Sequence, residues 1–268
     1  MHLSQLSLRF IDHYRSARKD LGRSLKTIYG ETVIIRQLVN FARSRRLIVK
    51  DPLKGLRNPK PRPTKQPCWS PEEIEQILNA AKEPQKSLFL LLADTGMRFG
   101  EAQWLTWEDI DFKSEVIHIR PKEGWQPKSG EARQVHMTAR LQSMLQSRRT
   151  ASGWVFYAAV SRLHPDANRQ LSERRTLKSL KRLLKRIGLS EVGKLHTFRH
   201  SFISKALAAG IPNATVRAWV GHVSDAILAL YTHVLDGQSQ AAIQRFSEAT
   251  PKPGSITDLS QSKEEPNA

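Results

Sequence analysis

The sequence predicts a mainly α-helical protein with one small antiparallel β-sheet, an α+β fold arranged in two domains. Three observations carry this prediction. Apolar residues recur every three or four positions along most of the chain, as they do on one face of a helix. Only two short segments, 116–120 and 133–137, fit strands, and a polar turn joins them. A proline-rich stretch at 58–67 separates a strongly basic first quarter from the remainder.

Two helices are expected before the proline-rich stretch. The first covers 3–17, and its apolar face carries Leu3, Leu6, Phe10 and Tyr14. The second runs from an N-cap at Ser24 to about residue 47. Its apolar stripe is expected to contain Ile28, Ile34 or Ile35, Leu38 and Phe41.

The domain boundary follows from proline placement. Asp51-Pro52 ends the second helix, because proline disfavours helical backbone in the residue before it. Four prolines within 58–67 then keep the chain extended. We therefore expect a helical domain at 1–62, a linker at 63–69, a second domain at 70–249 and a disordered tail at 250–268.

The second domain begins with a strong helix signal. Ser70 can cap the helix, Pro71 takes the first helical position and Glu73 completes a capping box. A helix over 84–94 should end at Gly96, and the two strands follow it. One later helix has an apolar stripe ending before Gly188, made of Leu177, Leu180, Leu184 and Ile187. Further helices are expected at 197–209, 213–220 and 224–234.

Charge points to a polyanionic partner. The 43 Lys and Arg residues exceed the 25 Asp and Glu by 18. Residues 1–66 carry 16 basic against 4 acidic side chains, a net charge of +12, and the rest of the chain carries +6. Nucleic acid is the commonest intracellular polyanion, so DNA or RNA is the expected partner. The alternative is a basic domain that is merely well solvated.

Composition excludes several other classes. The longest apolar run, Leu88–Ala93, is far too short to cross a membrane. The start of the chain lacks a secretory signal pattern. The single cysteine, Cys68, rules out an internal disulfide and a zinc site built on cysteines. We expect a cytoplasmic, nucleoid-associated protein with no membrane partner.

Two cationic side chains in the second domain suit phosphate chemistry. Arg98, in the segment Thr95–Glu101, follows a helix that ends at a glycine, so its guanidinium can be fixed at the edge of a cleft. A purely structural pairing with Glu101 is the alternative. Lys128 lies in the turn between the two strands, where it can donate a proton to a leaving oxygen. It can equally be a solvated loop lysine, and Lys122 is a rival in the same turn.

Histidines and a tyrosine complete the set of chemical candidates. On a helix, His196, Arg199 and His200 share one face and form a cradle for an anion rather than an apolar core. A metal site is disfavoured because no carboxylate or cysteine lies nearby in sequence. His200 is expected to be structural. Gly221-His222 precedes Tyr231, whose hydroxyl can attack a phosphodiester once arginines neutralise the other oxygens. The alternative for Tyr231 is a core residue.

These segments resemble the tyrosine recombinase, or phage integrase, family. Its catalytic pattern of Arg, Lys, His-x-x-Arg, His and Tyr has counterparts in the same order. The matching residues are Arg98, Lys128, His196, Arg199, His222 and Tyr231. The nine-residue step from His222 to Tyr231 agrees with the family, and a run of matches over about 135 residues is highly specific.

The resemblance covers roughly residues 3–248. It implies that 1–62 is a helical, SAM-like core-binding domain that binds DNA, with the Asp51-Pro52-Leu53 element before the linker. It implies that 70–249 is a DNA breaking-rejoining catalytic domain. Departures are small: Val220 replaces the usual leucine before Gly221, and the core-binding region is short. An arm-binding domain is expected to be absent.

The resemblance also implies a mechanism. Tyr231 would form a 3′-phosphotyrosine bond and release a 5′-hydroxyl, while Arg98 and Arg199 hold the nonbridging oxygens. Lys128 would protonate the leaving oxygen, and His222 would hydrogen-bond the phosphate. His196 would accept the tyrosine proton or position its acceptor. No cofactor, metal or ATP is expected, because the covalent bond conserves the energy for rejoining.

Partners follow from the same resemblance: double-stranded DNA, three further protomers in a synaptic homotetramer, and a candidate directionality factor. The segment 236–248 is the candidate contact with a neighbouring protomer, and packing on its own chain is the alternative. Two rival functions remain, a type IB topoisomerase-like enzyme and a non-catalytic DNA-binding protein.

Overall fold

The computed structural model describes residues 5–62, 66–128, 130–158, 169–190, 193–223 and 228. The chain divides into two compact units, Met1–Thr64 and Lys65–Ala268, at a point within the predicted linker. Several predicted features lie outside the described residues. They are the nucleophile Tyr231, the helix 224–234 apart from Leu228, the segment 236–248 and the tail 250–268.

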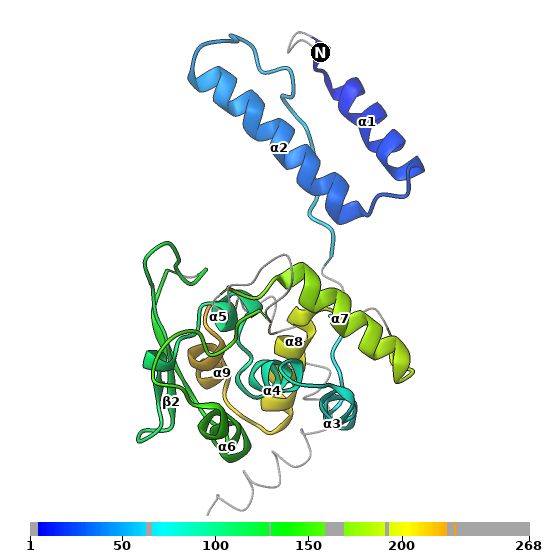
Figure 1. Ribbon diagram of the computed structural model, residues 1–268. Coiled ribbons are helices and arrows are strands. Elements are labelled where there is room, and N and C mark those ends of the chain that lie inside the picture. The colour runs from blue at the N-terminus through cyan, green and yellow to red at the C-terminus, as the bar shows by residue number, and fades with distance from the viewer. Residues whose placement is uncertain are drawn as a thin grey trace, which may run out of the picture. The chain divides into compact units, whose positions relative to one another are not determined.

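The first unit contains two helices that pack against each other (Figure 1). α1 spans Leu8–Asp20 and begins at Ser7, whose hydroxyl accepts a hydrogen bond from the first turn. α2 spans Leu25–Ser44 and begins at Ser24 in the same way, so the predicted N-cap is confirmed. The first helix starts five residues later than predicted because Ser7 caps it.

The apolar face of α2 differs from the predicted stripe. Ile28 is buried and Ile35 packs against the core, as predicted, but Ile34, Leu38 and Phe41 are 66%, 51% and 54% exposed. The buried residues of α2 are Ile28, Thr32, Val39 and Ala42. Thr32 explains the error, because its hydroxyl donates to the Ile28 carbonyl at 2.8 Å and a polar residue can then occupy the core.

The segment after α2 closes the core of this unit. Leu53 is fully buried in a cluster with Leu6, Ile11 and Val39. Asp51 holds the turn in place, since its Oδ1 accepts from the Leu53 amide at 2.9 Å and from Arg36 Nη1 at 3.1 Å. A short apolar core is thus supported by an ion pair.

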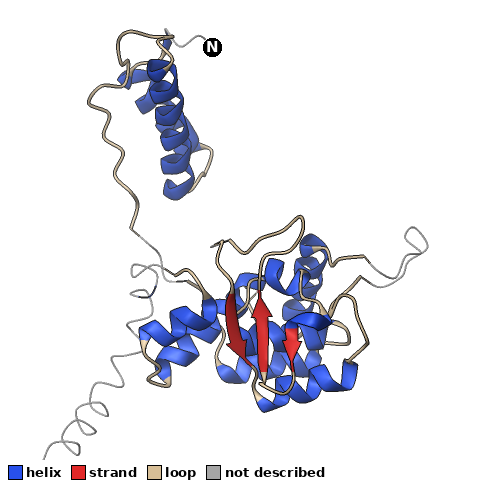
Figure 2. Ribbon diagram, turned by 90° about the vertical axis from the view of Figure 1, so that its left-hand side faces the viewer, coloured by secondary structure: helices blue, strands red, loops and turns tan. Residues whose placement is uncertain are grey.

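In the second unit, helices cover one face of a small sheet (Figures 1 and 2). The helices are α3 (Pro71–Ala80), α4 (Gln85–Thr95), α5 (Phe99–Gln103), α6 (Ala139–Arg148), α7 (Glu173–Arg186), α8 (Leu195–Ala208) and α9 (Asn213–Val220). A 3-10 turn covers Trp107–Asp109. The strands β1 (Ile110–Asp111), β2 (Val116–Ile119) and β3 (Arg133–His136) pair antiparallel in that order.

The mainly helical α+β fold class is confirmed, and so are most predicted elements of this unit. The Ser70 capping box is present, with Ser70 Oγ 3.2 Å from the Glu73 amide. Both predicted strands form, each ending one residue early, and Ile117 pairs with Val135. The strand β1 and the helices α5 and α6 were not predicted. No helix within the described ranges is long and apolar enough to span a membrane.

Helices α4 and α8 form the centre of the second unit. The Phe89 and Phe198 rings stack at 5.2 Å, and Trp69 meets Phe198 edge-on at 4.8 Å. The Trp69 amide also donates to Ser201 Oγ at 2.7 Å. This packing fixes the end of α4 against α8, and the candidate site lies at that junction.

Candidate active site

The turn between α4 and α5 presents Arg98. α4 ends at Gly96, which has a φ of +62°. A Cβ on Gly96 would lie 2.6 Å from the Phe202 ring, so only glycine fits. Arg98 is the N-cap of α5, and its side chain is 19% exposed. The guanidinium is thus fixed by backbone geometry yet remains accessible, as the sequence predicted.

A buried carboxylate orients Arg98. Glu101 Oε1 lies 3.1 Å from Arg98 Nη1, which realises the structural pairing considered as an alternative. Glu101 also receives two hydrogen bonds from Arg133, of 3.0 and 2.6 Å. Burial alone would raise the pKa of Glu101, but the hydrogen bonds and charge of Arg133, helped by Arg98, lower it below its ordinary value. Glu101 therefore stays ionised between two guanidinium groups.

Arg133 links this carboxylate to α9. Its Nε donates to the Trp219 carbonyl at 2.9 Å, and its side chain is 8% exposed. In the sequence, Arg133 stands out only as the first residue of a predicted strand. The pairing joins residues 32 positions apart, and no local pattern signals it.

Arg199 ties three helices together. It lies on α8 and is buried, 2% exposed. Its Nη1 donates to the Gly96 carbonyl at 2.9 Å and to the Val220 carbonyl at 2.6 Å. The ends of α4 and α9 are therefore held to one guanidinium.

Arg98 also donates a hydrogen bond to the segment that follows α9. Arg98 Nη2 lies 3.2 Å from the His222 carbonyl, two residues beyond the Val220 carbonyl that Arg199 binds. Gly221 between them has a φ of +75°. The predicted residues Arg98 and Arg199 are thus brought together on 220–222. His222 itself is exposed.

His196 and His200 lie on the same face of α8, as predicted. Their rings are perpendicular, with centroids 4.8 Å apart. Desolvation is the largest cause that lowers the pKa of His196 to about 4, followed by electrostatic interactions with His200, Arg199, Arg98 and Lys128. Burial and the Arg199 charge also lower the pKa of His200. Both imidazoles are therefore neutral at pH 7, and a neutral imidazole can accept a proton.

The two lysines of the β2–β3 connection differ in environment. The Lys122 ammonium donates to the Trp104 carbonyl and to Thr106 Oγ1, both at 2.8 Å, and pairs with Asp109. Lys128 is exposed at a turn, and its charge contributes to the lowered pKa of His196. Lys122 is therefore held by buried partners, whereas Lys128 is exposed.

An open hollow of about 1330 Å³ adjoins His222. It lies between β3 and α9, and its lining includes His118, His136 and Arg217. Within the described ranges, no group of three or more His, Cys, Asp or Glu side chains is placed to hold a metal ion.

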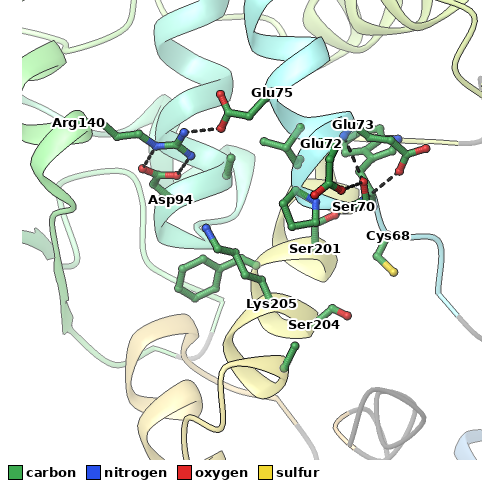
Figure 3. Close-up of a pocket in the computed structure, with 16 residues that line it drawn as sticks. Cys68, Ser70, Glu72, Glu73, Glu75, Asp94, Arg140, Ser201, Ser204 and Lys205 are labelled. Carbon is green, nitrogen blue, oxygen red and sulfur yellow. Dashed lines mark hydrogen bonds and ion pairs between the residues drawn. The ribbon is translucent and has the colours of Figure 1, made fainter. Parts of the chain in front are cut away.

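A separate pocket of about 540 Å³ lies on another face of α8 (Figure 3). Ser201, Ser204 and Lys205 of α8 line it. Arg140 bounds it, with Nε 2.7 Å from Asp94 Oδ2 and an ion pair to Glu75, drawn as dashed lines in Figure 3. This network joins α3, α4 and α6 and has a structural role.

Comparisons with known proteins agree with these features. The family model described as "Phage integrase family" matches residues 69–238. A tyrosine recombinase XerC-like protein of Caldanaerobacter subterraneus subsp. tengcongensis is 27% identical over 274 residues, 89% of this chain and 70% of the relative. Tyrosine recombinase XerA of Pyrococcus furiosus is 25% identical over 244 residues, 89% and 79% of the two chains.

Solved structures share the fold. The Tn1549 transposon integrase in complex with a circular intermediate DNA superimposes with a TM-score of 0.69 at 18% identity, covering 91% of this chain and 86% of that one. The XerH site-specific recombinase bound to a palindromic difH substrate gives 0.70 at 17% identity, covering 91% and 74%.

Proposed function

The chain belongs to the phage integrase family and is a site-specific tyrosine recombinase, and we propose that Tyr231 is the nucleophile with which it attacks DNA. The Tyr231 oxygen forms a bond to the scissile phosphorus, and the bond from phosphorus to the 5′-oxygen breaks. The products are a 3′-phosphotyrosine and a free 5′-hydroxyl. Attack by a 5′-hydroxyl on that phosphotyrosine reverses the step and rejoins the strand.

Arg98 and Arg199 bind the nonbridging oxygens of the scissile phosphate in this proposal. The observation that carries it is the convergence of both guanidinium groups on 220–222, at 3.2 Å from the His222 carbonyl and 2.6 Å from the Val220 carbonyl. Two fixed positive charges at one place stabilise the additional negative charge of a pentacoordinate phosphorus.

Proton transfers fall to the remaining residues. His196, neutral because its pKa is lowered to about 4, accepts the tyrosine proton or positions the group that does. Lys128 donates a proton to the leaving 5′-oxygen, and His222 hydrogen-bonds the phosphate. The reaction uses neither metal nor ATP, since transesterification keeps the energy of the broken bond in the phosphotyrosine.

Double-stranded DNA is the substrate and partner. The basic segment 1–66, which carries a net charge of +12 and includes the whole first unit, is proposed to bind the duplex together with the catalytic unit. Exchange between two duplexes requires four protomers, and 236–248 is the proposed contact between neighbours. A directionality factor is a further candidate partner, and binding to DNA places the protein at the nucleoid.

Covalent trapping tests the proposal. The protein is incubated without metal on nicked duplexes taken from the flanks of its own gene, and adducts that resist SDS are sought. We expect an adduct with wild type and none with Tyr231→Phe, while both proteins bind DNA equally.

The alternatives give different results. An adduct that leads to relaxation of supercoils without strand exchange between two duplexes indicates a topoisomerase-like enzyme. Tight binding without any adduct indicates a non-catalytic DNA-binding protein and contradicts the role of Tyr231. Sequencing the trapped strand gives the cleavage position.

A further inference from the structure

The connection between β2 and β3, residues 120–132, is here called the β2–β3 arm. Lys128 lies near its end in a tight turn, where the Gly130 amide donates to the Pro127 carbonyl at 2.8 Å. Pro127 is buried, whereas Lys128 is exposed. The turn is therefore anchored at the buried Pro127, while Lys128 is exposed to solvent.

A second turn within the arm covers residues 122–125, and two backbone hydrogen bonds join its first and last residues. The Lys122 amide donates to the Trp125 carbonyl at 2.8 Å, and the Trp125 amide donates back to the Lys122 carbonyl at 3.0 Å. Gly124 supplies the positive φ of +75° that the turn needs. This closed turn holds the Lys122 and Trp125 side chains on one short piece of backbone.

Both side chains contact the C-terminal end of α5. Trp125 stacks on Trp104, with ring centroids 5.8 Å apart and planes 11° apart. The Lys122 ammonium donates to the Trp104 carbonyl and pairs with Asp109, which is 1% exposed. Trp104 is the C-cap of α5, the helix whose N-cap is Arg98. The arm is thus attached to the same five-residue helix that presents Arg98.

We propose that Lys122 and Trp125 are positioning residues, which brace the β2–β3 arm against α5 and so hold Lys128 at the phosphate that Arg98 binds. Trp125 precedes Lys128 by three residues, a span of at most about 11 Å of extended chain. A fixed Trp125 therefore confines the Lys128 backbone to a small volume beside the site. The inference rests on the proposed role of Lys128 as proton donor.

The test compares two leaving groups on a duplex whose cleavage position has been mapped by trapping. One substrate has the ordinary 5′-oxygen, and the other has sulfur at that bridging position. A thiolate leaves without a proton, because thiols are far more acidic than alcohols. A defect in proton donation therefore slows cleavage of the oxygen substrate and spares the sulfur substrate.

We expect Trp125→Ala to slow cleavage of the oxygen substrate between roughly tenfold and a hundredfold. Its rate on the sulfur substrate should stay within about twofold of wild type, the size of effect that a correctly folded site permits. Trp125→Phe keeps a stacking ring and should restore most of the rate. Lys122→Met, which leaves Asp109 paired with Arg120 at 2.9 Å, gives the same selective pattern if Trp125→Ala does not fold.

Trp154 provides the matched control. Its ring packs edge-on against Trp104 at 5.6 Å but lies outside the arm. Trp154→Ala should affect both substrates equally. An equal slowing of both substrates by Trp125→Ala, or no slowing of either, overturns the proposal.

Lys128→Ala separates this inference from the proposed function. If sulfur does not rescue Lys128→Ala, the assignment of Lys128 as proton donor falls, and the inference falls with it. If sulfur rescues Lys128→Ala but not Trp125→Ala, only the inference falls.

A measurement on the protein alone gives an independent answer. The His196 ring is titrated by NMR, because the Lys128 charge contributes to its lowered pKa. Lys128→Ala should raise the pKa of His196, Trp125→Ala should raise it too, and the double variant should raise it no further than Lys128→Ala does. The proposal is wrong if Trp125→Ala leaves this pKa unchanged while Lys128→Ala raises it.

Discussion

Glu101 controls the position of two arginines from a single buried carboxylate. It is 2% exposed at its side chain and accepts hydrogen bonds from Arg98 and Arg133. Removing one member of a buried ion network leaves the others charged and unpaired, which costs more than the network itself contributes. The stability of the second unit and the orientation of the Arg98 side chain therefore both depend on Glu101.

Glu101→Gln should lower the free energy of unfolding by about 3 kcal/mol, because Arg133 then lies buried without a counter-charge. Urea denaturation followed by tryptophan fluorescence measures the change. Glu123→Gln, at an exposed position of the β2–β3 arm, is the control and should be neutral. A loss below about 1 kcal/mol, the range of surface ion pairs, contradicts the assigned role.

The lowered pKa of Glu101 predicts that the folded protein loses stability in acid. Its folded pKa is lowered, so its contribution to stability is complete above the pKa of the unfolded chain and is lost as pH falls through the folded value. The wild-type protein should therefore lose stability below about pH 4.5, the ordinary range for glutamate. Glu101→Gln should show a shallower loss over the same interval when melting temperatures are compared.

His196 gives a pH dependence in a different interval. Its pKa falls from 6.5 to about 4 on folding, so the unfolded chain binds the proton first as pH decreases. Stability is lost between pH 6.5 and 4, and His196→Asn should lose less than wild type in a series of thermal melts. His136→Asn, at an exposed position on β3, is the control. Equal losses in wild type and His196→Asn would show that His196 keeps an ordinary pKa when folded.

At this scale the sequence predicts which residues meet but not how they are held. Helix spacing placed His196 and Arg199 on one face, and the resemblance to the tyrosine recombinase family implied that Arg98 joins them. It did not reveal the Arg133 pairing with Glu101, because side chains 32 residues apart pair only through tertiary structure. The resemblance already matched Lys128 to the family's lysine, and the structure adds the buried partners that engage its rival Lys122.

Among the elements, the end of α4 is the most constrained. Gly96 has a positive φ, almost no space for a side chain, and a carbonyl bound by Arg199 at 2.9 Å. These three demands coincide at one residue, so a change there disturbs α4, α8 and the site together.

Gly96→Ala should destabilise the protein by about 2 kcal/mol or more, through backbone strain and the contact with Phe202. It should also abolish adduct formation. Gly100→Ala is the matched control, because Gly100 lies in α5 with no atom within 4 Å of an added Cβ. Alanine there should be neutral or stabilising by up to about 1 kcal/mol. Equal effects of the two substitutions in thermal melts would refute this account.

The predictions of helices and strands were correct where local sequence signals, such as capping residues, agree with the packing. The capping box at Ser70 and the helix α9, predicted as 213–220, are local features and were correct. The predicted stripe of α2 was wrong at Leu38 and Phe41, because the buried face instead includes Thr32, whose hydroxyl bonds within its own helix. Helix α6 was missed because only Leu141 and Leu145 are buried along it, too few to mark a period.

On the scale of the whole molecule, charge is divided unequally between the two units. Residues 1–66 carry a net charge of +12 against +6 for the other 202 residues. Counterion release from DNA makes such binding steeply dependent on salt. The first unit is therefore expected to set affinity, while the second performs chemistry.

Lys50→Gln combined with Lys54→Gln should reduce the slope of log affinity against log salt by about 1.8, at about 0.9 for each phosphate contact. Both lysines are exposed in the first unit. Lys82→Gln with Lys86→Gln, exposed in the second unit, is the matched control and should change the slope less. Fluorescence anisotropy on a duplex at several salt concentrations measures both. A larger change from the second pair would place the electrostatic footprint on the catalytic unit.

The two hydrogen bonds that Arg199 donates have a consequence for the order in which the site forms during synthesis. The two carbonyl partners of Arg199 lie 103 and 21 residues away along the chain, one on each side. A nascent polypeptide that has reached Arg98 but not Val220 cannot fix either arginine on 220–222. The phosphate site proposed for Arg98 and Arg199 therefore cannot assemble until α9 and residues 220–222 have been synthesised, well after the basic first unit.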